Sequence, residues 1–310
     1  MKRAVVTGSN GYIGLVLCKM LKEKGYYVIG VDTKLYVNNK YCDEMINDDI
    51  AAIHLNIKRS DDYSYFHLAA SSLLGPSATN PLLYYENNTA KTIKLLQTMK
   101  PRNIVFASTA AVYAPHDKTV NERSVLSPPN NYGRSKLWCE QVIDSCFVTD
   151  NIRACSFRFF NVIGTYGEVG LQNNTPHVLS QLCEAGLKNK PFNINGTDYQ
   201  TRDGTCVRDY VHVVDVCRAM IHMSELLDAS APRHFKYNLG TGIGTSVKEM
   251  VDIFRTVAKD VNTNWIGRRE GDPPYLVADP SKFIEDTNFN YYYNSEHLPD
   301  IISEVWRSRQ

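Results

Sequence analysis

The sequence has no apolar run that approaches the ~18 residues a membrane-spanning helix needs. Its formal net charge is only +1, so charge gives no reason to expect nucleic acid or an anionic membrane as a partner. The eight cysteines include no CxxC pair, which argues against a metal site and a disulfide framework. The apolar stretch near the first residue is too short for a signal peptide. We therefore expect a cytoplasmic protein that works without metal, membrane or nucleic acid.

The first 160 residues alternate between strand-like and helix-like segments. Such alternation, with continuously apolar strands, predicts an α/β fold in which helices cover both faces of a doubly wound parallel sheet. Only the segment KRSDD separates the third and fourth strands, whereas a crossover helix needs roughly a dozen residues. Either a loop replaces that helix or the strand boundaries are misjudged. Strands are expected over 3–7, 26–32, 51–57, 63–69, 103–108 and 152–159, and helices over 12–24, 86–99 and 132–148.

The pattern changes after residue 162, where Gly, Asn, Pro and Thr become frequent. One helix is expected near 176–188 and a stronger one over 246–258, with a weakly ordered tail beyond it. Residues 211–226 again have a strand and helix pattern and are expected to return to the first domain. We therefore predict a first domain over 1–162 and a smaller C-terminal α+β lobe over 163–310.

A glycine-rich loop, Gly8-Ser9-Asn10-Gly11-Tyr12-Ile13-Gly14, follows the first strand and opens the first helix. Its glycines let the backbone turn tightly and approach a pyrophosphate, and the helix N-terminus offers free N–H groups to the phosphates. The second strand ends in Asp32, 18 residues past Gly14. A carboxylate there can bind both adenosine ribose hydroxyls and repel a 2′-phosphate. The loop therefore predicts a Rossmann-type domain that binds NAD rather than NADP.

Residues 240–245 (GTGIGT) look like a second glycine-rich loop. The following Ser246-Val-Lys-Glu249 has the capping-box pattern that starts a helix. Glycines ahead of a capped helix need no ligand, so we assign no second nucleotide site here.

Tyr132 and Lys136 begin a helical segment and lie four residues apart, on one helix face. A lysine ammonium near a tyrosine hydroxyl favours the phenolate and should lower the tyrosine pKa from about 10 toward working pH. That predicts a general acid/base for a sugar hydroxyl. A surface tyrosine with a solvated lysine is the alternative, which the glycine-rich loop upstream disfavours.

The segment Ala107-Ser108-Thr109 ends an apolar strand. A hydroxyl at the C-terminal end of a parallel strand points into the crevice where ligands bind in this architecture. We choose Thr109 as the hydroxyl that bonds the reacting oxygen, with Ser108 as the competitor that the sequence does not exclude.

Together these motifs resemble the extended short-chain dehydrogenase/reductase family and, within it, the UDP-glucose (UDP-galactose) 4-epimerases. The resemblance implies NAD as cofactor, a UDP-sugar as substrate, and a homodimer that packs helices 86–99 and 132–148. It covers nearly the whole chain through FHLAA at 66–70, PLLYYENN at 81–88, FASTAAVY at 106–113, RFFNVIG at 158–164, DGTCVRDYVHVVD at 203–215, NLGTGIGTSVKE at 238–249 and REGDPPYLVADPSK at 269–282.

The resemblance also implies roles for individual residues. Tyr132, Lys136 and Thr109 match the catalytic residues, and Thr109 and Tyr132 also match substrate contacts. An arginine suits a diphosphate because its fork donates two aligned, charge-assisted hydrogen bonds, although each arginine could instead form a surface ion pair. Implied cofactor contacts are Gly8, Gly11, Tyr12, Ile13, Gly14, Asp32, Ile57, Leu68, Ala69, Asn87 and Phe160, with Tyr132 and Lys136; implied contacts to the nucleotide part of the substrate are Asn161, Asn174, Arg208, Arg269 and Asp272.

Some positions depart from the family pattern. Ala110 and Ala111 stand where related 4,6-dehydratases carry an Asp-Glu pair, so the resemblance favours epimerisation over dehydration. Ser72 replaces a lysine near the cofactor, and Asn56 replaces an aspartate that meets adenine, so NAD retention is expected to weaken. Leu276 occupies the position that sets substrate size in these epimerases, and its intermediate bulk leaves N-acetylated sugars open.

The sequence therefore predicts an enzyme that oxidises a UDP-sugar at C4 and reduces the 4-keto sugar on its opposite face. The nearest alternative is another nucleotide-sugar enzyme on the same scaffold, namely a decarboxylase, a 4,6-dehydratase or a reductase. A non-catalytic NAD-sensing or interaction protein is an alternative of a different class, since a fold does not fix a function.

Overall fold

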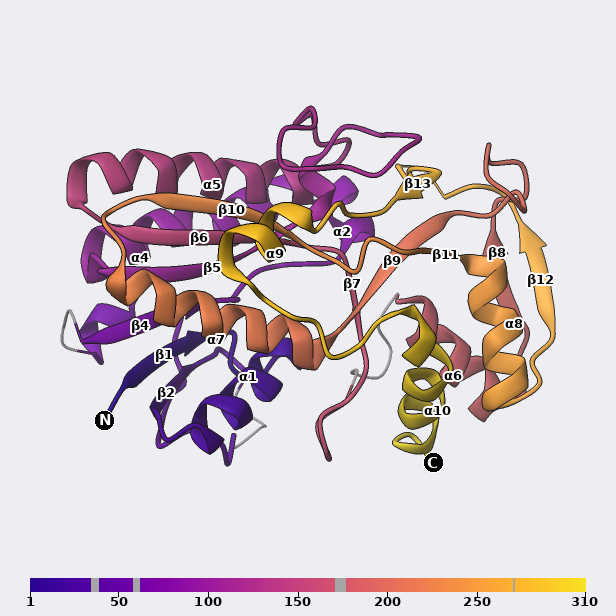
Figure 1. The fold of residues 1–310 in the computed structure, drawn as a ribbon, viewed down its shortest axis with the longest axis horizontal. Helices are drawn as coiled ribbons and strands as arrows, with labels where there is room; N and C mark the ends of the chain where they lie inside the picture. The colour runs from indigo at the N-terminus through magenta and orange to yellow at the C-terminus, as the bar shows by residue number, and fades with distance from the viewer. Residues whose placement is uncertain (35–38, 58–61, 171–176, 270) are drawn as a thin grey trace. The chain divides into compact units, whose positions relative to one another are not determined.

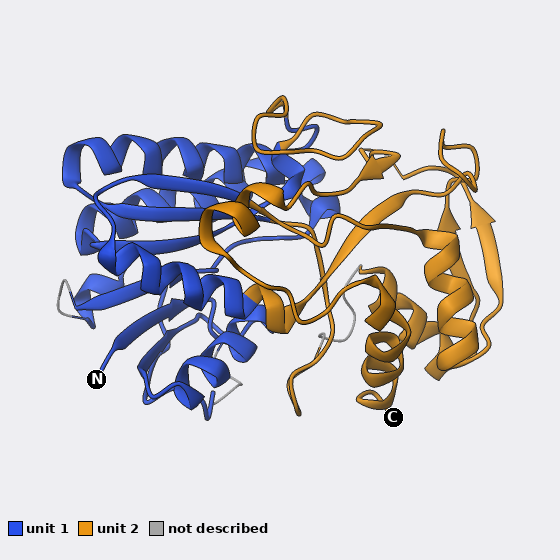
Figure 2. Ribbon diagram, viewed as in Figure 1, with its two compact units in different colours: residues 1–112, 128–158, 217–237 blue, residues 113–127, 159–216, 238–310 orange. Residues whose placement is uncertain are grey.

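The computed structural model describes residues 1–34, 39–57, 62–170, 177–269 and 271–310. The chain divides into two compact units, each assembled from three segments (Figure 2). Residues 113–127 group with unit 2, and the segment 211–226 is divided between the units, with unit 1 resuming at Cys217. Unit 1 comprises residues 1–112, 128–158 and 217–237, and unit 2 comprises residues 113–127, 159–216 and 238–310.

Unit 1 carries the principal sheet, seven strands in the order β10-β6-β5-β4-β1-β2-β3. β1 pairs in parallel with strands on both sides, so that Arg3 lies opposite Tyr27 of β2 and Tyr63 of β4. The strands are apolar on both faces because both faces are covered, and Val5 and Ile104 have no exposed surface. The strands are β1 (Arg3–Thr7), β2 (Tyr27–Val31), β3 (Glu44–Ile46), β4 (Tyr63–His67), β5 (Asn103–Thr109), β6 (Arg153–Phe159) and β10 (His234–Leu239).

The sheet is doubly wound, as predicted. The chain moves outward from β1 to β2 and β3, returns to the other side of β1, and continues through β4, β5 and β6. Right-handed crossovers in both directions place the helices on opposite faces. α4 (Lys91–Met99) and α5 (Asn131–Asp150) cover one face, and α1 (Tyr12–Glu23) and α7 (Val213–Ala229) the other (Figure 1). The strand order reverses between β1 and β4, which is where ligands bind in such sheets.

The strand predicted over 51–57 is wrong. This segment forms a 3-10 turn, η1 (Ile53–Leu55), and the third strand along the chain is β3, which pairs with β2. Ile50, Ile53 and Ile57 recur at helical spacing and are buried in the core of unit 1. The strand boundaries were therefore misjudged, and the short interval before β4 raises no topological problem.

The helix predicted over 86–99 begins earlier and contains a π-helical turn. α3 (Pro81–Tyr84) continues into the π-helical η2 (Tyr85–Ala90) and then into α4. Asn88 of this turn is buried, accepts a hydrogen bond from the Ser71 N–H at 2.7 Å and donates to the Ser135 hydroxyl of α5 at 2.9 Å. π-Helical turns are frequent at functional sites, and this one joins the loop after β4 to α5. The short α2 (Leu74–Thr79) precedes it.

Unit 2 is organised around β9, which pairs with β7, β11 and β13, while β8 pairs with β12. α8 packs against α6 and α10, with the Phe254 ring edge-on to Trp306 at 5.6 Å. The strands are β7 (Asn161–Ile163), β8 (Phe192–Asn195), β9 (Val207–His212), β11 (Gly244–Ser246), β12 (Thr263–Ile266) and β13 (Tyr275–Leu276); the helices are α6 (Val178–Lys188), α8 (Val247–Val257), α9 (Ser281–Thr287) and α10 (Leu298–Arg307).

The prediction of a weakly ordered C-terminal tail is also wrong. α9 and α10 are regular helices, and α10 buries Ile301, Ile302 and Val305. Their short apolar stripes lie between polar loops, so the stripes are hard to detect until α8 provides the surface against which α10 packs.

Candidate active site

The glycine-rich loop has the tight geometry that its sequence predicts. A Cβ atom on Gly14 would lie 2.1 Å from the Gly8 carbonyl oxygen, and Gly8 has a φ of +72° with the Ala69 backbone beside it. Gly11 precedes α1 and provides no side-chain cap, so the first N–H groups of the helix are not taken by a capping side chain. A turn this close to a helix N-terminus fits the pyrophosphate of a dinucleotide.

Asp32, just past the end of β2, is fixed against this loop. Its carboxylate accepts hydrogen bonds from the backbone N–H groups of Asn10 and Lys34, each at 2.9 Å. A carboxylate has about four acceptor positions, so both oxygens can still accept from ribose hydroxyls. The residues present therefore fit the adenosine half of NAD.

The loop after β4 is tied to the end of β1. The N–H groups of Leu68 and Ala69 donate to the carbonyl and the hydroxyl of Thr7 at 3.1 and 3.2 Å, and that hydroxyl also bonds the buried His67 ring at 2.7 Å. This places both residues at the reversal of strand order. Of the other predicted cofactor contacts, Tyr12 and Ile13 open α1, Ile57 is buried after η1, Asn87 in η2 donates to the Ser71 hydroxyl, and Phe160 belongs to unit 2.

The two departures near the predicted cofactor site are exposed. Ser72 lies in the loop between β4 and α2. The Asn56 amide donates to the Asp48 carboxylate at 3.0 Å, so a carboxylate stands next to the position where the family carries one. Their effect on NAD retention stays a prediction.

Tyr132 and Lys136 lie in the first turns of α5. Asn130 caps this helix by accepting from the Gly133 N–H at 2.8 Å, which fixes where the helix begins. Lys136 is 3% exposed, and its ammonium lies 4.3 Å from the centre of the Phe106 ring of β5. Tyr84 packs edge-on against the Tyr132 ring at 6.4 Å.

The predicted lowering of the tyrosine pKa is wrong for the protein alone. Burial raises the pKa of Tyr132 to about 12, and the neighbouring Thr109 hydroxyl acts in the opposite direction but does not offset it. Burial also lowers the pKa of Lys136 to about 8. Both shifts have the same cause, since a low-dielectric site disfavours whichever form is charged.

The structure separates the two hydroxyls that the sequence left open. Thr109 lies close enough to Tyr132 to act on its pKa, whereas the Ser108 hydroxyl points to the other side of β5 and donates to the buried Glu140 carboxylate at 2.5 Å. Neighbouring residues on a strand face opposite ways, so only one of the two can meet the tyrosine.

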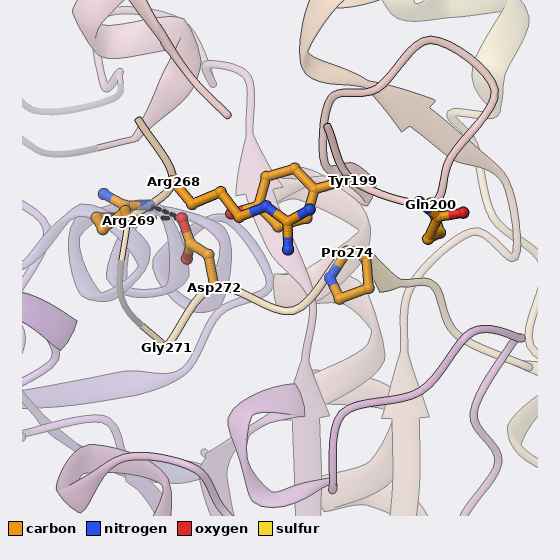
Figure 3. A pocket seen from close by; sticks show the side chains of 7 residues that line it. All are labelled: Tyr199, Gln200, Arg268, Arg269, Gly271, Asp272 and Pro274. Carbon is orange, nitrogen blue, oxygen red and sulfur yellow. Dashed lines mark hydrogen bonds and ion pairs between the residues drawn. The ribbon is translucent and has the colours of Figure 1, made fainter. Parts of the chain in front are cut away.

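Unit 2 gathers three of the residues predicted to hold the substrate. Arg208 of β9 is 9% exposed and lies 3.9 Å from the Asp272 carboxylate, to which Arg269 donates through Nε at 2.9 Å. Arg269 itself is half exposed. Asp272 thus joins two cations from distant parts of the chain, and Arg269 and Asp272 line a cavity of about 370 Å³ (Figure 3). Its lining is Tyr199, Gln200, Arg268, Arg269, Gly271, Asp272 and Pro274.

Two more predicted positions lie on strands next to Arg208. Asn161 of β7 is opposite Tyr210 of β9, and Leu276 of β13 is opposite Arg208 itself. Asn174 lies outside the described residues.

Sequence reasoning missed the aromatic side of this cavity. The Arg268 guanidinium lies 4.5 Å from the centre of the Tyr199 ring and donates to Asp198 at 2.7 Å. Both contacts join a loop after β8 to one after β12, and no spacing or composition in the sequence marks them.

The second glycine-rich segment has a structural explanation. Ser246 and Glu249 form the predicted capping box of α8. The buried Asp209 carboxylate accepts from the Thr241 and Gly242 N–H groups at 2.8 and 2.9 Å, and a Cβ on Gly240 would lie 2.5 Å from it. These glycines make room for Asp209.

All eight cysteines are free. Across the described residues, no group of His, Cys, Asp and Glu side chains is arranged to hold a metal ion. Within the same part of the chain, no helix is long and apolar enough to cross a membrane.

Unit 1 has a doubly wound sheet, a tight glycine-rich loop and a helix that carries a Tyr-x-x-x-Lys pair. This combination is that of an NAD-dependent protein of the short-chain dehydrogenase type. Residues 4–240 match the model of the NAD dependent epimerase/dehydratase family. The chain is 34% identical over 322 residues to UDP-glucose 4-epimerase of Rhizobium meliloti (strain 1021), covering 97% of this chain and 95% of the relative. It belongs to the NAD dependent epimerase/dehydratase family.

Solved structures agree with this assignment. The UDP-glucose 4-epimerase from Brucella ovis in complex with NAD superposes with a TM-score of 0.91 at 30% identity, over 99% of this chain and 98% of that one. The UDP-Glc/GlcNAc 4-epimerase from Campylobacter jejuni gives a TM-score of 0.82 at 28% identity, over 99% of both chains.

Proposed function

We propose that this protein catalyses NAD-dependent 4-epimerisation of a UDP-sugar and interconverts UDP-glucose and UDP-galactose through a 4-keto sugar. The observation that carries the proposal is that Tyr132 and the buried Lys136 lie one turn apart on α5, with Thr109 of β5 beside the tyrosine. The relatives support it, because they are UDP-glucose 4-epimerases matched over nearly their whole length.

The cofactor residues lie in unit 1. Gly8, Gly11 and Gly14 would hold the pyrophosphate of NAD, and Asp32 its adenosine ribose. NAD, when bound, supplies a two-electron acceptor for the hydrogen at sugar C4 and can return that hydrogen to either face.

Tyr132 moves the proton. Its phenolic oxygen takes the proton of the C4 hydroxyl during oxidation and gives it back during reduction. Thr109 hydrogen-bonds the reacting oxygen, and the Lys136 ammonium stabilises the phenolate that the raised pKa of Tyr132 otherwise disfavours.

Arg208 and Arg269 hold the diphosphate while the 4-keto sugar rotates and presents its opposite face. Two guanidinium forks can each form paired, charge-assisted bonds with phosphate oxygens, and Asp272 keeps them together before the substrate arrives. The side chains of Ala110 and Ala111 carry no acid or base for the loss of water, which favours epimerisation over dehydration.

The direct test is to incubate the purified protein with UDP-galactose and, separately, UDP-N-acetylgalactosamine, with and without added NAD. We expect the matching gluco-epimer from UDP-galactose, and conversion of the acetylated sugar would show that Leu276 leaves room for it. Dependence on added NAD would show that Ser72 and Asn56 weaken retention. An oxidised, decarboxylated or dehydrated product from another nucleotide sugar would instead support one of the other enzymes on this scaffold.

We also propose a homodimer formed through α3, η2 and α5. Apolar side chains are exposed on these elements: Leu82 is 76% exposed, Leu83 41% and Trp138 46%. Tyr85 of η2 stacks on Trp138 at 4.7 Å, which gives the surface a rigid aromatic centre.

Trp138→Glu should convert the dimer to a monomer, raising the dimer dissociation constant by roughly a hundredfold or more. The matched control is Trp265→Glu on β12, where the tryptophan is 51% exposed but lies in unit 2. Sedimentation velocity over a range of protein concentrations measures both. A W138E protein that stays dimeric would contradict this interface, as would a W265E protein that dissociates.

A further inference from the structure

A buried charged cluster lies beside the Tyr-Lys helix and has no part in the proposed reaction. Ser108, Glu140 and Arg158 are 2%, 1% and 1% exposed. Ser108 Oγ donates to Glu140 Oε1 at 2.5 Å, and Arg158 donates to the same carboxylate through Nε at 3.1 Å and Nη2 at 2.7 Å. One carboxylate thus joins α5, β5 and β6 inside unit 1.

The cluster adjoins two residues of the proposed active site. Glu140 follows Lys136 by four residues and lies on the same face of α5. Ser108 immediately precedes Thr109 on β5. The carboxylate therefore fixes the position of the helix that carries Tyr132 and Lys136 relative to the strand that carries Thr109.

Stability alone does not explain such a pair. Removing two charges from water costs about as much as the pair returns, and apolar residues of similar volume often serve a core equally well. An ion pair retained at 1% exposure next to a buried lysine points to an electrostatic role instead.

The surroundings of Lys136 show what that role is. Burial raises the pKa of Cys139 and, with the neighbouring Lys136, lowers the pKa of His67 of β4 to about 3, so both side chains are neutral at working pH. Around Lys136, Phe106 of β5 presents only its uncharged ring face, and the neighbouring η2 presents the neutral side chains of Asn88 and Thr89. Burial lowers the pKa of Lys136 to about 8, and Cys139 and then the Glu140 carboxylate act in the opposite direction. Because the raised pKa of Cys139 keeps that thiol neutral, Glu140 is the negatively charged group among these described neighbours.

We propose that the Ser108–Glu140–Arg158 cluster is a positioning device for the Tyr132–Lys136 pair: Glu140 keeps the Lys136 ammonium charged, and Arg158 limits how strongly it does so. This rests on the proposed function, in which the charged lysine supports the phenolate of Tyr132. Glu140 and Arg158 act only through Lys136 and are positioning residues.

The test is the pH dependence of kcat for UDP-galactose epimerisation at saturating NAD and substrate. In the wild-type enzyme the alkaline limb should fall as Lys136 loses its proton, because the active form is the charged lysine below its pKa. Glu140→Gln removes the stabilising negative charge and leaves the Arg158 cation. The alkaline limb should then move to lower pH by about one unit, with kcat roughly fivefold lower at pH 8.

Arg158→Gln should act in the opposite direction. Removing the cation leaves the Glu140 carboxylate unneutralised, so the limb should move to higher pH. The double variant E140Q/R158Q removes both charges and should return the limb close to its wild-type position. Ser108→Ala changes no charge, so it should leave the alkaline limb of the kcat profile in place. Because it removes a hydrogen bond that positions Glu140, it should still lower kcat severalfold. Thermal unfolding followed by circular dichroism identifies variants that retain the fold.

Opposite shifts of the alkaline limb in E140Q and R158Q would support the positioning role, since a purely structural role would shift the limb in neither variant. Unmoved limbs in folded variants would overturn it, and if E140Q does not fold, the R158Q limb decides alone. Failure of the proposed function would be distinguishable. It would be contradicted if the wild-type protein did not epimerise UDP-galactose or if Tyr132→Phe stayed active, independently of the pH profiles of the cluster variants.

Discussion

Replacing Tyr132 with phenylalanine should lower kcat by roughly a thousandfold and leave the fold and NAD binding intact, because general acid–base catalysis typically contributes factors of this size. The ring remains to pack against Tyr84, so only the hydroxyl beside Thr109 is lost. Substrate conversion with UDP-galactose, together with calorimetric titration of NAD, measures both effects. Activity within tenfold of wild type would remove Tyr132 from the mechanism.

Tyr84→Phe is the matched control. This tyrosine is 2% exposed, lies edge-on to Tyr132, and donates its hydroxyl to the Leu73 carbonyl at 2.5 Å rather than to a group of the proposed site. Its loss should reduce the free energy of unfolding by about 1 kcal/mol and change kcat no more than a few-fold. A large fall in kcat for Y84F would show that packing around Tyr132, and not its hydroxyl alone, carries the effect.

Arg208→Gln should raise the KM for the UDP-sugar by roughly 10- to 100-fold, since a guanidinium contributes charge-assisted bonds to a diphosphate that a neutral amide does not replace. Arg208 is nearly buried and its partner is Asp272, so in the variant Asp272 loses one of its two cations and the diphosphate loses one of its two forks. Initial rates over a range of UDP-galactose concentrations separate KM from kcat.

Arg202→Gln provides the comparison within unit 2. Arg202 is 47% exposed, binds Glu249 and the Gly244 carbonyl, and is not among the residues that line the cavity with Arg269 and Asp272. Its removal should leave KM within twofold of wild type, because exposed ion pairs contribute little and this one touches no group proposed to bind substrate. Equal increases in KM for R202Q and R208Q would argue that Arg208 acts through general charge and not through contact.

The local parts of the fold follow from the sequence. Alternating apolar strands and amphipathic helices predict the doubly wound sheet, and Gly8, Gly11 and Gly14 predict the tight turn before α1. Ser246 and Glu249 predict the start of α8. These features depend on backbone geometry within a few residues, which is why side-chain type and spacing are sufficient to reveal them.

The errors arose where a segment takes its structure from a distant partner. The apolar residues around Ile53 fit either a strand or a helical turn, and only packing in the core of unit 1 selects the turn. Glu44–Ile46 becomes a strand because β2 offers an edge to pair with, and α10 forms against α8. A short window of sequence holds none of these partners.

For the candidate site, the sequence by itself determined which residue types are available: a glycine-rich turn, a carboxylate after the second strand, a tyrosine and lysine on one helix face, and arginines in the second half. Tertiary structure alone decided that Thr109 and not Ser108 meets Tyr132, that burial raises the pKa of the tyrosine, and that Asp272 joins Arg208 to Arg269. The physical reason is that charge and hydrogen bonding depend on the local dielectric and on distances of a few ångströms between residues far apart in the chain.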